Sequence, residues 1–126
     1  MSDLRSILVV EDDPPTRMLL EAVARRNHLH PILCGDGSTA LRHLASDNFA
    51  VILLDLRLPG RVDGFEILRQ LAARQSPMLR RIIVVTAVTQ ARLRSCAEIE
   101  SVCKVLRKPF ELRVLEEHIR ACDGAP

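Results

Sequence analysis

Tryptophan and tyrosine are absent from the sequence, and aromatic residues make up only 2% of its 126 positions. Proteins that bind single-stranded nucleic acids stack the bases on such rings, so this chain offers no stacking platform. Its formal net charge of +2 at pH 7 is also too small to predict a nucleic-acid surface. We therefore expect no direct contact with nucleic acid.

Long apolar runs are missing as well, and no stretch approaches the roughly 20 apolar residues that a membrane helix needs. Residues 1–6, MSDLRS, lack the basic, apolar and small-residue sections of a signal peptide. Apolar residues make up 48% of the chain and charged residues 27%, which is the composition of a soluble globular protein. We expect a cytoplasmic protein without a membrane partner.

The cysteines do not form a metal-binding or redox motif. No CxxC pair occurs, and no histidine is positioned to complete a zinc site. The four cysteines lie far apart along the chain, at Cys34, Cys96, Cys103 and Cys122. We expect them to be reduced side chains that pack in the interior.

Five apolar runs of strand length occur along the chain. The runs at 6–10, 50–54 and 81–85 are rich in Val, Ile and Leu and show no polar alternation. This pattern is typical of strands that are covered on both faces in a parallel sheet. The runs at 31–34 and 103–107 are weaker, because they contain a proline or alternate polar with apolar residues. These two are expected at the edges of the sheet.

Helical periodicity appears after each of these runs. The predicted helices cover residues 14–26, 38–46, 65–74, 89–98 and 111–122. In the first of them, Met18, Leu19, Ala22 and Val23 are predicted to form the buried face. Residues 89–98 contain the fewest apolar side chains, so we expect that helix to be held least firmly.

Strand and helix therefore alternate five times, which predicts an α/β fold with a doubly wound, parallel, five-stranded (βα)5 sheet. With the two weak strands at the edges, the strand order is 2-1-3-4-5, the flavodoxin-like order. The length fits one domain over residues 1–126 with a core of about 5–122 and no effector domain. Ligands of such sheets gather at the carboxyl ends of the strands.

Polar residues follow four of the predicted strands at that edge. They are Glu11, Asp12 and Asp13 after the first strand, Asp55 after the third, Thr86 after the fourth and Lys108 after the fifth. Taken singly, each has an ordinary structural explanation; Asp13, for example, can cap the following helix. Taken together, they place several mutually repelling carboxylates on one edge, which calls for a cation. Carboxylate oxygens in a small site suit Mg²⁺.

The same loop does not fit a nucleotide or flavin site, because neither GxGxxG nor GxxxxGK[ST] is present. A cation beside Asp55 makes phosphoryl transfer to that carboxylate plausible, since aspartate can accept phosphoryl groups and the metal offsets the charge of the incoming oxygens.

Four segments, ILVVEDD (7–13), ILLDLRLPG (52–60), IIVVTA (82–87) and LRKPF (106–110), occur in this order. In order and spacing they resemble the four motifs of the response regulator receiver domain of two-component signalling. The resemblance covers nearly the whole chain. It implies a signalling phosphoacceptor rather than an enzyme, with a histidine kinase or a histidine phosphotransfer protein as the phosphodonor.

The resemblance also implies a role for each residue of the site. Asp55 is the expected phosphoacceptor, and Thr86 and Lys108 are expected to contact the phosphoryl group. Glu11, Asp12, Asp55 and the backbone carbonyl of Arg57 are the expected Mg²⁺ ligands. The backbone N–H groups near Leu56, Arg57 and Ala87 are expected to complete the phosphoryl cradle. The Lys108–Pro109 bond is expected to be cis.

Three features depart from the usual pattern of the family. Val105 stands three residues before Lys108, where receivers commonly carry an aromatic residue or histidine whose rotamer follows the threonine. A β-branched side chain is stiff at χ1, so that form of coupling between Thr86 and Val105 is in doubt. IESVC (99–103) lacks a Gly-Ala pair, and PGRVDG (59–64) has one extra residue. We expect phosphorylation to survive these departures, which leave the output route open. Arg57 and Val88 are candidates for tuning the lifetime of the phosphoryl group, although surface residues without a function explain them equally well.

Two other functions compete with this interpretation. Val105 motivates a receiver-like interaction module that works without phosphorylation, although the intact site argues against it. A Mg²⁺ phosphohydrolase with an aspartyl intermediate usually has a second acid two residues after the nucleophile, and Arg57 occupies that place.

The charged surface from the fourth helix, fifth strand and fifth helix is a hypothetical partner or homodimer surface, and a solvated charged face explains it equally well. Its residues are Arg92, Arg94, Lys104, Arg107, Arg113, Glu116 and Arg120.

Overall fold

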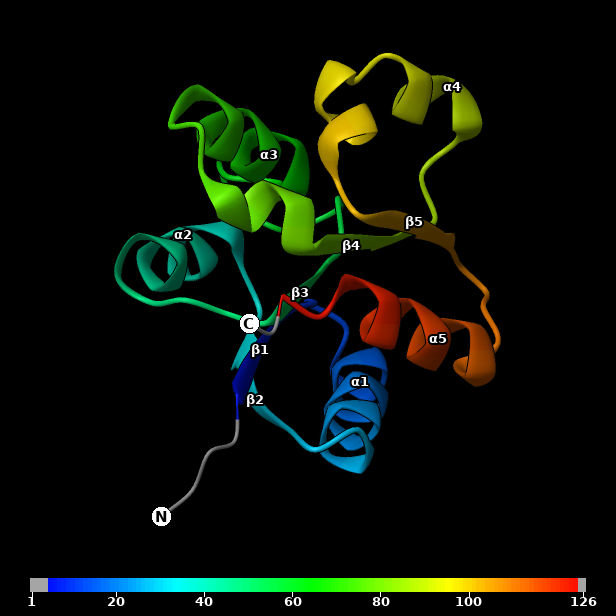
Figure 1. Ribbon diagram of the computed structural model, residues 1–126. Coiled ribbons are helices and arrows are strands. Elements are labelled where there is room, and N and C mark those ends of the chain that lie inside the picture. The colour runs from blue at the N-terminus through cyan, green and yellow to red at the C-terminus, as the bar shows by residue number, and fades with distance from the viewer. Residues whose placement is uncertain (1–4, 125–126) are drawn as a thin grey trace.

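The computed structural model describes residues 5–124, which form a central sheet covered by helices on both faces (Figure 1). The strands are β1 (Arg5–Val10), β2 (Leu29–Cys34), β3 (Val51–Leu54), β4 (Ile82–Thr86) and β5 (Lys104–Arg107). The α-helices are α1 (Pro14–Arg26), α2 (Gly37–Ser46), α3 (Gly64–Ala73), α4 (Gln90–Arg94) and α5 (Leu112–Cys122). Two short 3₁₀ helices, η1 (Pro77–Arg81) and η2 (Ala97–Ser101), precede β4 and β5.

The five strands are parallel and lie in the order β2-β1-β3-β4-β5, which confirms the predicted α/β fold. The register pairs Val10 with Leu54 and Leu54 with Val84, so that β1, β3 and β4 end close to the same level. The residues that follow these strands are therefore delivered to one edge of the sheet. No helix within residues 5–124 is long and apolar enough to cross a membrane.

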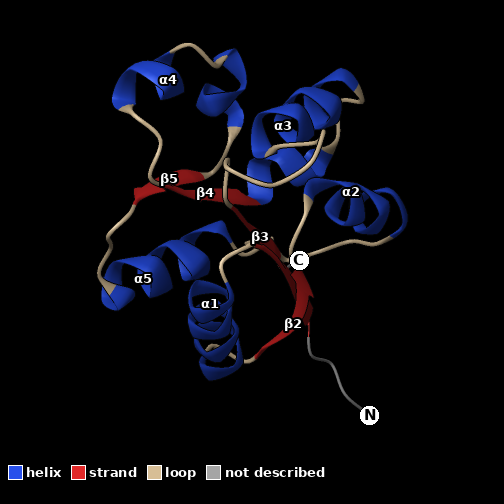
Figure 2. Cartoon of the chain, turned by 180° about the vertical axis from the view of Figure 1, so that it is seen from behind, coloured by secondary structure: helices blue, strands red, loops and turns tan. Residues whose placement is uncertain are grey.

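Two apolar cores lie on opposite faces of the sheet. Helices α1 and α5 cover one face, and α2, α3 and α4 cover the other (Figure 2). Alternate residues of each central strand point into the two cores; in β1, for example, Leu8 faces one core and Ile7 the other. Burial on both faces explains why the central strands read as continuous apolar runs.

The buried face of α1 differs from the prediction. Leu20, Val23 and Ala24 are buried, whereas Met18 and Leu19 of the predicted stripe are 68% and 41% exposed. The predicted and the observed buried faces both satisfy the helical spacing of three and four residues, so periodicity alone does not distinguish them. The way in which the helix packs on the sheet decides which one is buried.

The predicted helix over 89–98 is broken into two pieces. Helix α4 ends at Arg94, and the chain passes through Cys96 before η2 begins. Within α4, Leu93 is the buried residue. A single buried side chain gives this helix little packing against the sheet, which agrees with the expectation that it is held least firmly.

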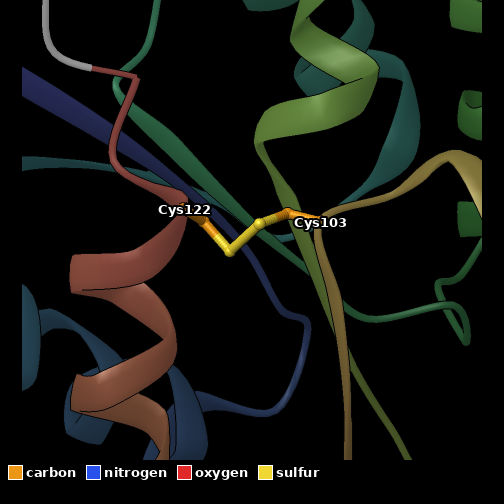
Figure 3. The surroundings of a disulfide bond; sticks show 2 residues. All are labelled: Cys103 and Cys122. Carbon is orange, nitrogen blue, oxygen red and sulfur yellow. A yellow bond between two sulfur atoms is a disulfide. The ribbon is translucent and has the colours of Figure 1, made fainter.

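A disulfide bond corrects the prediction that all cysteines are reduced. Cys103, directly before β5, is bonded to Cys122, the last residue of α5 (Figure 3). The two residues are 19 positions apart in sequence, but α5 runs back along the sheet and brings their Cα atoms within 6.0 Å. This proximity is a tertiary property that the spacing does not reveal. Cys34 and Cys96 are free and buried, as predicted.

Candidate functional site

A cleft of about 790 Å³ opens at the carboxyl edge of the sheet. Glu11 and Asp12 enter it from the loop after β1, Asp55 from the loop after β3, and Lys108 from the loop after β5. The sequence predicted that these residues would meet. The cleft brings them together in the way that the strand order requires.

Three carboxylates form a compact group in this cleft. Each of Glu11, Asp12 and Asp55 offers an oxygen atom that lies within 4.8 Å of the others. Glu11 is 1% exposed and Asp55 6% exposed, while Asp12 is exposed to solvent. Oxygen ligands at this spacing, with one open side, suit a hard divalent cation that keeps several of its water molecules. The residues present therefore fit a Mg²⁺ ion.

Lys108 partly balances this negative charge. Its Nζ atom donates hydrogen bonds to Glu11 Oε1 at 2.8 Å and to Asp55 Oδ2 at 3.2 Å. Burial raises the pKa of Glu11, and the nearby Asp55 charge adds to this effect, although the bond from Lys108 opposes it. Burial also disfavours the Lys108 ammonium, but its bond to Glu11 and the charge of Asp55 outweigh this and raise its pKa. The lysine is therefore held in its charged form between two acids.

Hydrogen bonds between side chains and the backbone hold the acidic loop after β1. The N–H group of Asp13 donates to Glu11 Oε2 at 3.2 Å, and the Arg17 guanidinium donates to the Glu11 carbonyl oxygen at 2.9 Å. Asp13 itself caps α1 by accepting a hydrogen bond from the Thr16 N–H at 3.1 Å, as predicted. The three consecutive acids thus divide into two groups, with Glu11 and Asp12 in the site and Asp13 at the helix cap.

Hydrogen bonds also hold the loop after β3. The Asp55 N–H donates to the Val10 carbonyl at 3.0 Å, and the Arg57 N–H donates to Asp55 Oδ1 at 3.0 Å. Gly64 packs so closely that a Cβ atom there would lie 2.5 Å from Leu56 Cα. Leu56, Arg57 and the exposed Ala87 all line the cleft, as expected of the predicted phosphoryl cradle.

Thr86 lies at the end of β4 but is completely buried and does not line the cleft. Its hydroxyl oxygen accepts a hydrogen bond from the Val88 N–H at 3.2 Å, and its carbonyl accepts one from the Lys108 N–H at 2.8 Å. The Lys108–Pro109 bond is cis, as the resemblance implied. Thr86 therefore pairs with Arg107 in the sheet, directly before Lys108, and its hydroxyl is bonded within the loop after β4.

Val105 lies outside the site. It lines a second groove of about 550 Å³ between α4, η2 and β5, together with Leu93 and Ile99. Arg94 and Arg107 also line this groove. The position that usually carries a ring is thus occupied by a half-buried aliphatic side chain with open space beside it.

Two residues of the hypothetical partner surface lie elsewhere. Glu116 faces α1, where its carboxylate accepts hydrogen bonds from Arg26 at 2.7 and 2.9 Å and from Asn27 at 2.9 Å. Arg92 lines the acidic cleft, with its guanidinium carbon 3.7 Å from the centre of the Phe65 ring. Phe65 was not predicted to belong to the site, and no motif signals its contact with Arg92, because the contact joins two different helices.

Comparison with known proteins agrees with this geometry. Residues 7–120 match the family model of the response regulator receiver domain. The chain is 34% identical over 110 residues to the transcriptional activator protein PfeR of Pseudomonas aeruginosa, covering 87% of this chain and 35% of that protein. It is 30% identical over 116 residues to the response regulator receiver protein CpdR of Brucella abortus, covering 92% of this chain and 94% of CpdR.

Solved structures show the same fold. The receiver domain of a sensor histidine kinase from Pseudomonas aeruginosa PAO1, which holds a magnesium ion in its active site cleft, superposes with a TM-score of 0.83 at 30% identity, covering 97% of this chain and 99% of that domain. The response regulator TrrA of Thermotoga maritima, in complex with Mg²⁺ and BeF, gives a TM-score of 0.80 at 26% identity, covering 94% and 99%. The family match, the fold and the acidic cleft lead to one conclusion: this chain belongs to the response regulator receiver domain family of two-component signalling.

Proposed function

We propose that the chain accepts a phosphoryl group on Asp55 from a phosphohistidine of a histidine kinase or a phosphotransfer protein. The reaction depends on Mg²⁺, and the phosphorylated form changes its association with a partner or with a second copy of the chain. The observation that carries this proposal is the contact of Lys108 with both Glu11 and Asp55 in a cleft that also contains Asp12.

Glu11, Asp12, Asp55 and the backbone carbonyl of Arg57 would hold the Mg²⁺ ion. When bound, the ion offsets the negative charge of the phosphoryl oxygens as they approach the carboxylates. The buried Glu11 supports this assignment, because a carboxylate with 1% exposure is costly to keep charged unless cations lie beside it.

In the transfer step, an Asp55 carboxylate oxygen forms a bond to phosphorus while the bond from phosphorus to the donor imidazole nitrogen breaks. The electron pair of that bond stays on the departing nitrogen. Lys108 donates to Asp55 already and is placed to donate to a phosphoryl oxygen. The N–H groups of Leu56, Arg57 and Ala87 are candidates for the remaining oxygens.

Thr86 would respond to the product rather than assist the transfer. Its hydroxyl now accepts a hydrogen bond from the Val88 N–H and retains its own proton to donate. An acyl phosphate on Asp55 adds strong acceptor oxygens. A rotation of the Thr86 hydroxyl toward them gives a contact that exists only in the phosphorylated state.

The test is phosphorylation by acetyl phosphate or a cognate kinase in the presence of Mg²⁺, followed by intact-mass analysis. The wild type should gain one phosphoryl group, and Asp55→Asn should gain none. Asp47→Asn is a matched control, because it makes the same chemical change at an exposed acid after α2. Labelling that persists in Asp55→Asn would show that the acceptor is another residue.

One observation favours a second candidate, an interaction module that works without phosphorylation. Val105 lacks a ring that could change position between states, and the groove beside it is already open. This candidate predicts partner binding that is unaffected by Mg²⁺ and by beryllofluoride. A measured Mg²⁺ affinity that disappears in Asp12→Asn would count against it.

The surface from α4, β5 and α5 is the proposed site of the changed association. Arg94, Lys104 and Arg107 are exposed there, and two of them flank the apolar groove. Light scattering with and without beryllofluoride tests for a change in mass. An unchanged mass, together with unchanged partner binding, would remove this surface from the proposed output.

A further inference from the structure

Arg92 lines the acidic cleft, and the roles proposed above for the carboxylates and Lys108 do not include it. It belongs to α4, but its guanidinium lies 3.7 Å from the centre of the Phe65 ring of α3. Both residues line the same cleft as Asp55 and Lys108. Besides Lys108 and Arg57, the cleft therefore contains a cation contributed by the helix that is held least firmly.

The ring beneath Arg92 is anchored directly to the Asp55 loop. Phe65 is 4% exposed and follows Gly64, whose N–H donates to the Leu56 carbonyl at 3.0 Å. The ring on which Arg92 stacks thus belongs to a segment that is hydrogen-bonded to the Asp55 loop.

Most of the donors of Arg92 remain available. A guanidinium carries five N–H groups, and stacking on a ring face uses none of them. One nitrogen donates to Ser95 Oγ at 3.1 Å, and the side chain is exposed. Lys108, in contrast, has three donors, and two of them are directed at Glu11 and Asp55. An additional anionic group in the cleft has free donors on Arg92 to pair with.

We propose that Arg92 is a phosphoryl-binding residue: when Asp55 is phosphorylated, the Arg92 guanidinium pairs with a phosphoryl oxygen and draws α4 toward the site. This inference rests on the proposed function of Asp55. A planar guanidinium suits phosphate oxygens because it can donate two parallel hydrogen bonds.

The weak attachment of α4 makes this contact effective. Leu93 is the buried residue of this five-residue helix, so a new charge-assisted hydrogen bond is comparable in strength to the packing that holds it. The route runs from Asp55 through Arg92 to α4 and needs no ring at Val105. It offers this chain a link between the site and the proposed partner surface that does not depend on the missing aromatic residue.

The test compares beryllofluoride affinity in the presence of Mg²⁺ for the wild type, Arg92→Gln, Arg92→Lys and Arg80→Gln. The last variant is the matched control, since it removes the same charge from an exposed arginine of η1. Arg92→Gln should weaken binding about tenfold, the loss expected for one partly exposed charge-assisted hydrogen bond. The affinity of Arg92→Lys should lie between those of the wild type and Arg92→Gln, because lysine keeps the charge but lacks the planar guanidinium. The affinity of Arg80→Gln should equal that of the wild type.

The change in hydrogen exchange of the α4 amides on adding beryllofluoride provides a second measurement, and a purely structural role of Arg92 would leave that change the same in the wild type and in Arg92→Gln. Beryllofluoride should slow exchange in α4 of the wild type and leave it unchanged in Arg92→Gln. If Arg92 only packs α4 on Phe65, Arg92→Gln will lower the stability of the free protein and leave the beryllofluoride affinity unchanged, which would overturn the inference. Failure of the wild type to bind beryllofluoride would instead overturn the proposed function, and the role of Arg92 with it.

Discussion

Reduction of the disulfide between Cys103 and Cys122 should destabilise the fold by an amount that follows from its position. The bond joins residues 19 positions apart, and the loop that it closes contains β5 and α5. Closing a loop of this length removes chain entropy from the unfolded state that is worth about 3 kcal/mol at 25 °C. With the urea dependence usual for small domains, this corresponds to a midpoint lower by between about 1 and 3 M.

The assay is urea unfolding with and without reductant, combined with thiol titration. The double variant Cys103→Ser, Cys122→Ser should unfold at the same urea midpoint as the reduced wild type. Reductant should not change the midpoint of this variant, since its remaining cysteines, Cys34 and Cys96, are free. The reduced wild type keeps both sulfur atoms and therefore separates the effect of the cross-link from that of packing. An unchanged midpoint in a sample whose four thiols all titrate would refute the reasoning.

Three further predictions concern the packing around the site and α2. Burial raises the pKa of the Cys34 thiol to about 11, so alkylation of the native protein, followed by mass spectrometry, should be slow at neutral pH and accelerate as the pH approaches that value. Alkylation as fast as in the unfolded chain would contradict it. Gly64→Ala places a Cβ atom 2.5 Å from Leu56 Cα and should lower stability by about 1–3 kcal/mol in urea unfolding, whereas an unchanged midpoint would show that the loop can adapt. Hydrogen bonds from the Thr39 N–H and hydroxyl lower the pKa of Asp36, which caps α2. The stability that this cap contributes is therefore fully present above the pKa of Asp36 in the unfolded chain, near 4, and is lost as the pH falls through its lower pKa in the folded protein. Asp36→Ala should therefore cost about 1 kcal/mol at pH 7, and this difference should shrink in acid unfolding experiments below about pH 4.

The order of the strands could be predicted because each central strand is a continuous apolar run, and the two weak runs could be assigned to the edges. The buried face of α1 could not be predicted in the same way. Leu20 with Val23 and Leu19 with Val23 both satisfy helical spacing, and only the packing of the helix on the sheet distinguishes them. Sequence periodicity therefore identified the helix but not its rotation about its own axis.

The acidic part of the site could be predicted because its residues directly follow strands, and the ends of parallel strands meet at one edge. The contact of Arg92 with Phe65 and the disulfide bond could not, because both depend on how separate elements cross. Arg92 was predicted on the outer surface from its position in the fourth helix. In the structure this side chain instead lines the cleft and lies over the Phe65 ring of α3.

The charges of the cleft give a physical reason for metal dependence. Its acidic side chains are Glu11, Asp12, Asp13, Asp55 and Asp63, and its cationic side chains are Arg57, Arg92 and Lys108. Asp13 and Asp63 cap α1 and α3, so Glu11, Asp12 and Asp55 are the carboxylates that gather in the cleft, and a divalent cation would offset their mutual repulsion. Lys108 has a constraint of its own, because it is bonded to the buried Glu11 as well as to Asp55. If Lys108 turns toward a phosphoryl oxygen as proposed, a metal ion would offset the charge of Glu11 that the lysine now balances, since a buried carboxylate without a partner is strongly destabilising. The contact with Glu11 would therefore couple the proposed phosphoryl binding by Lys108 to the metal ion.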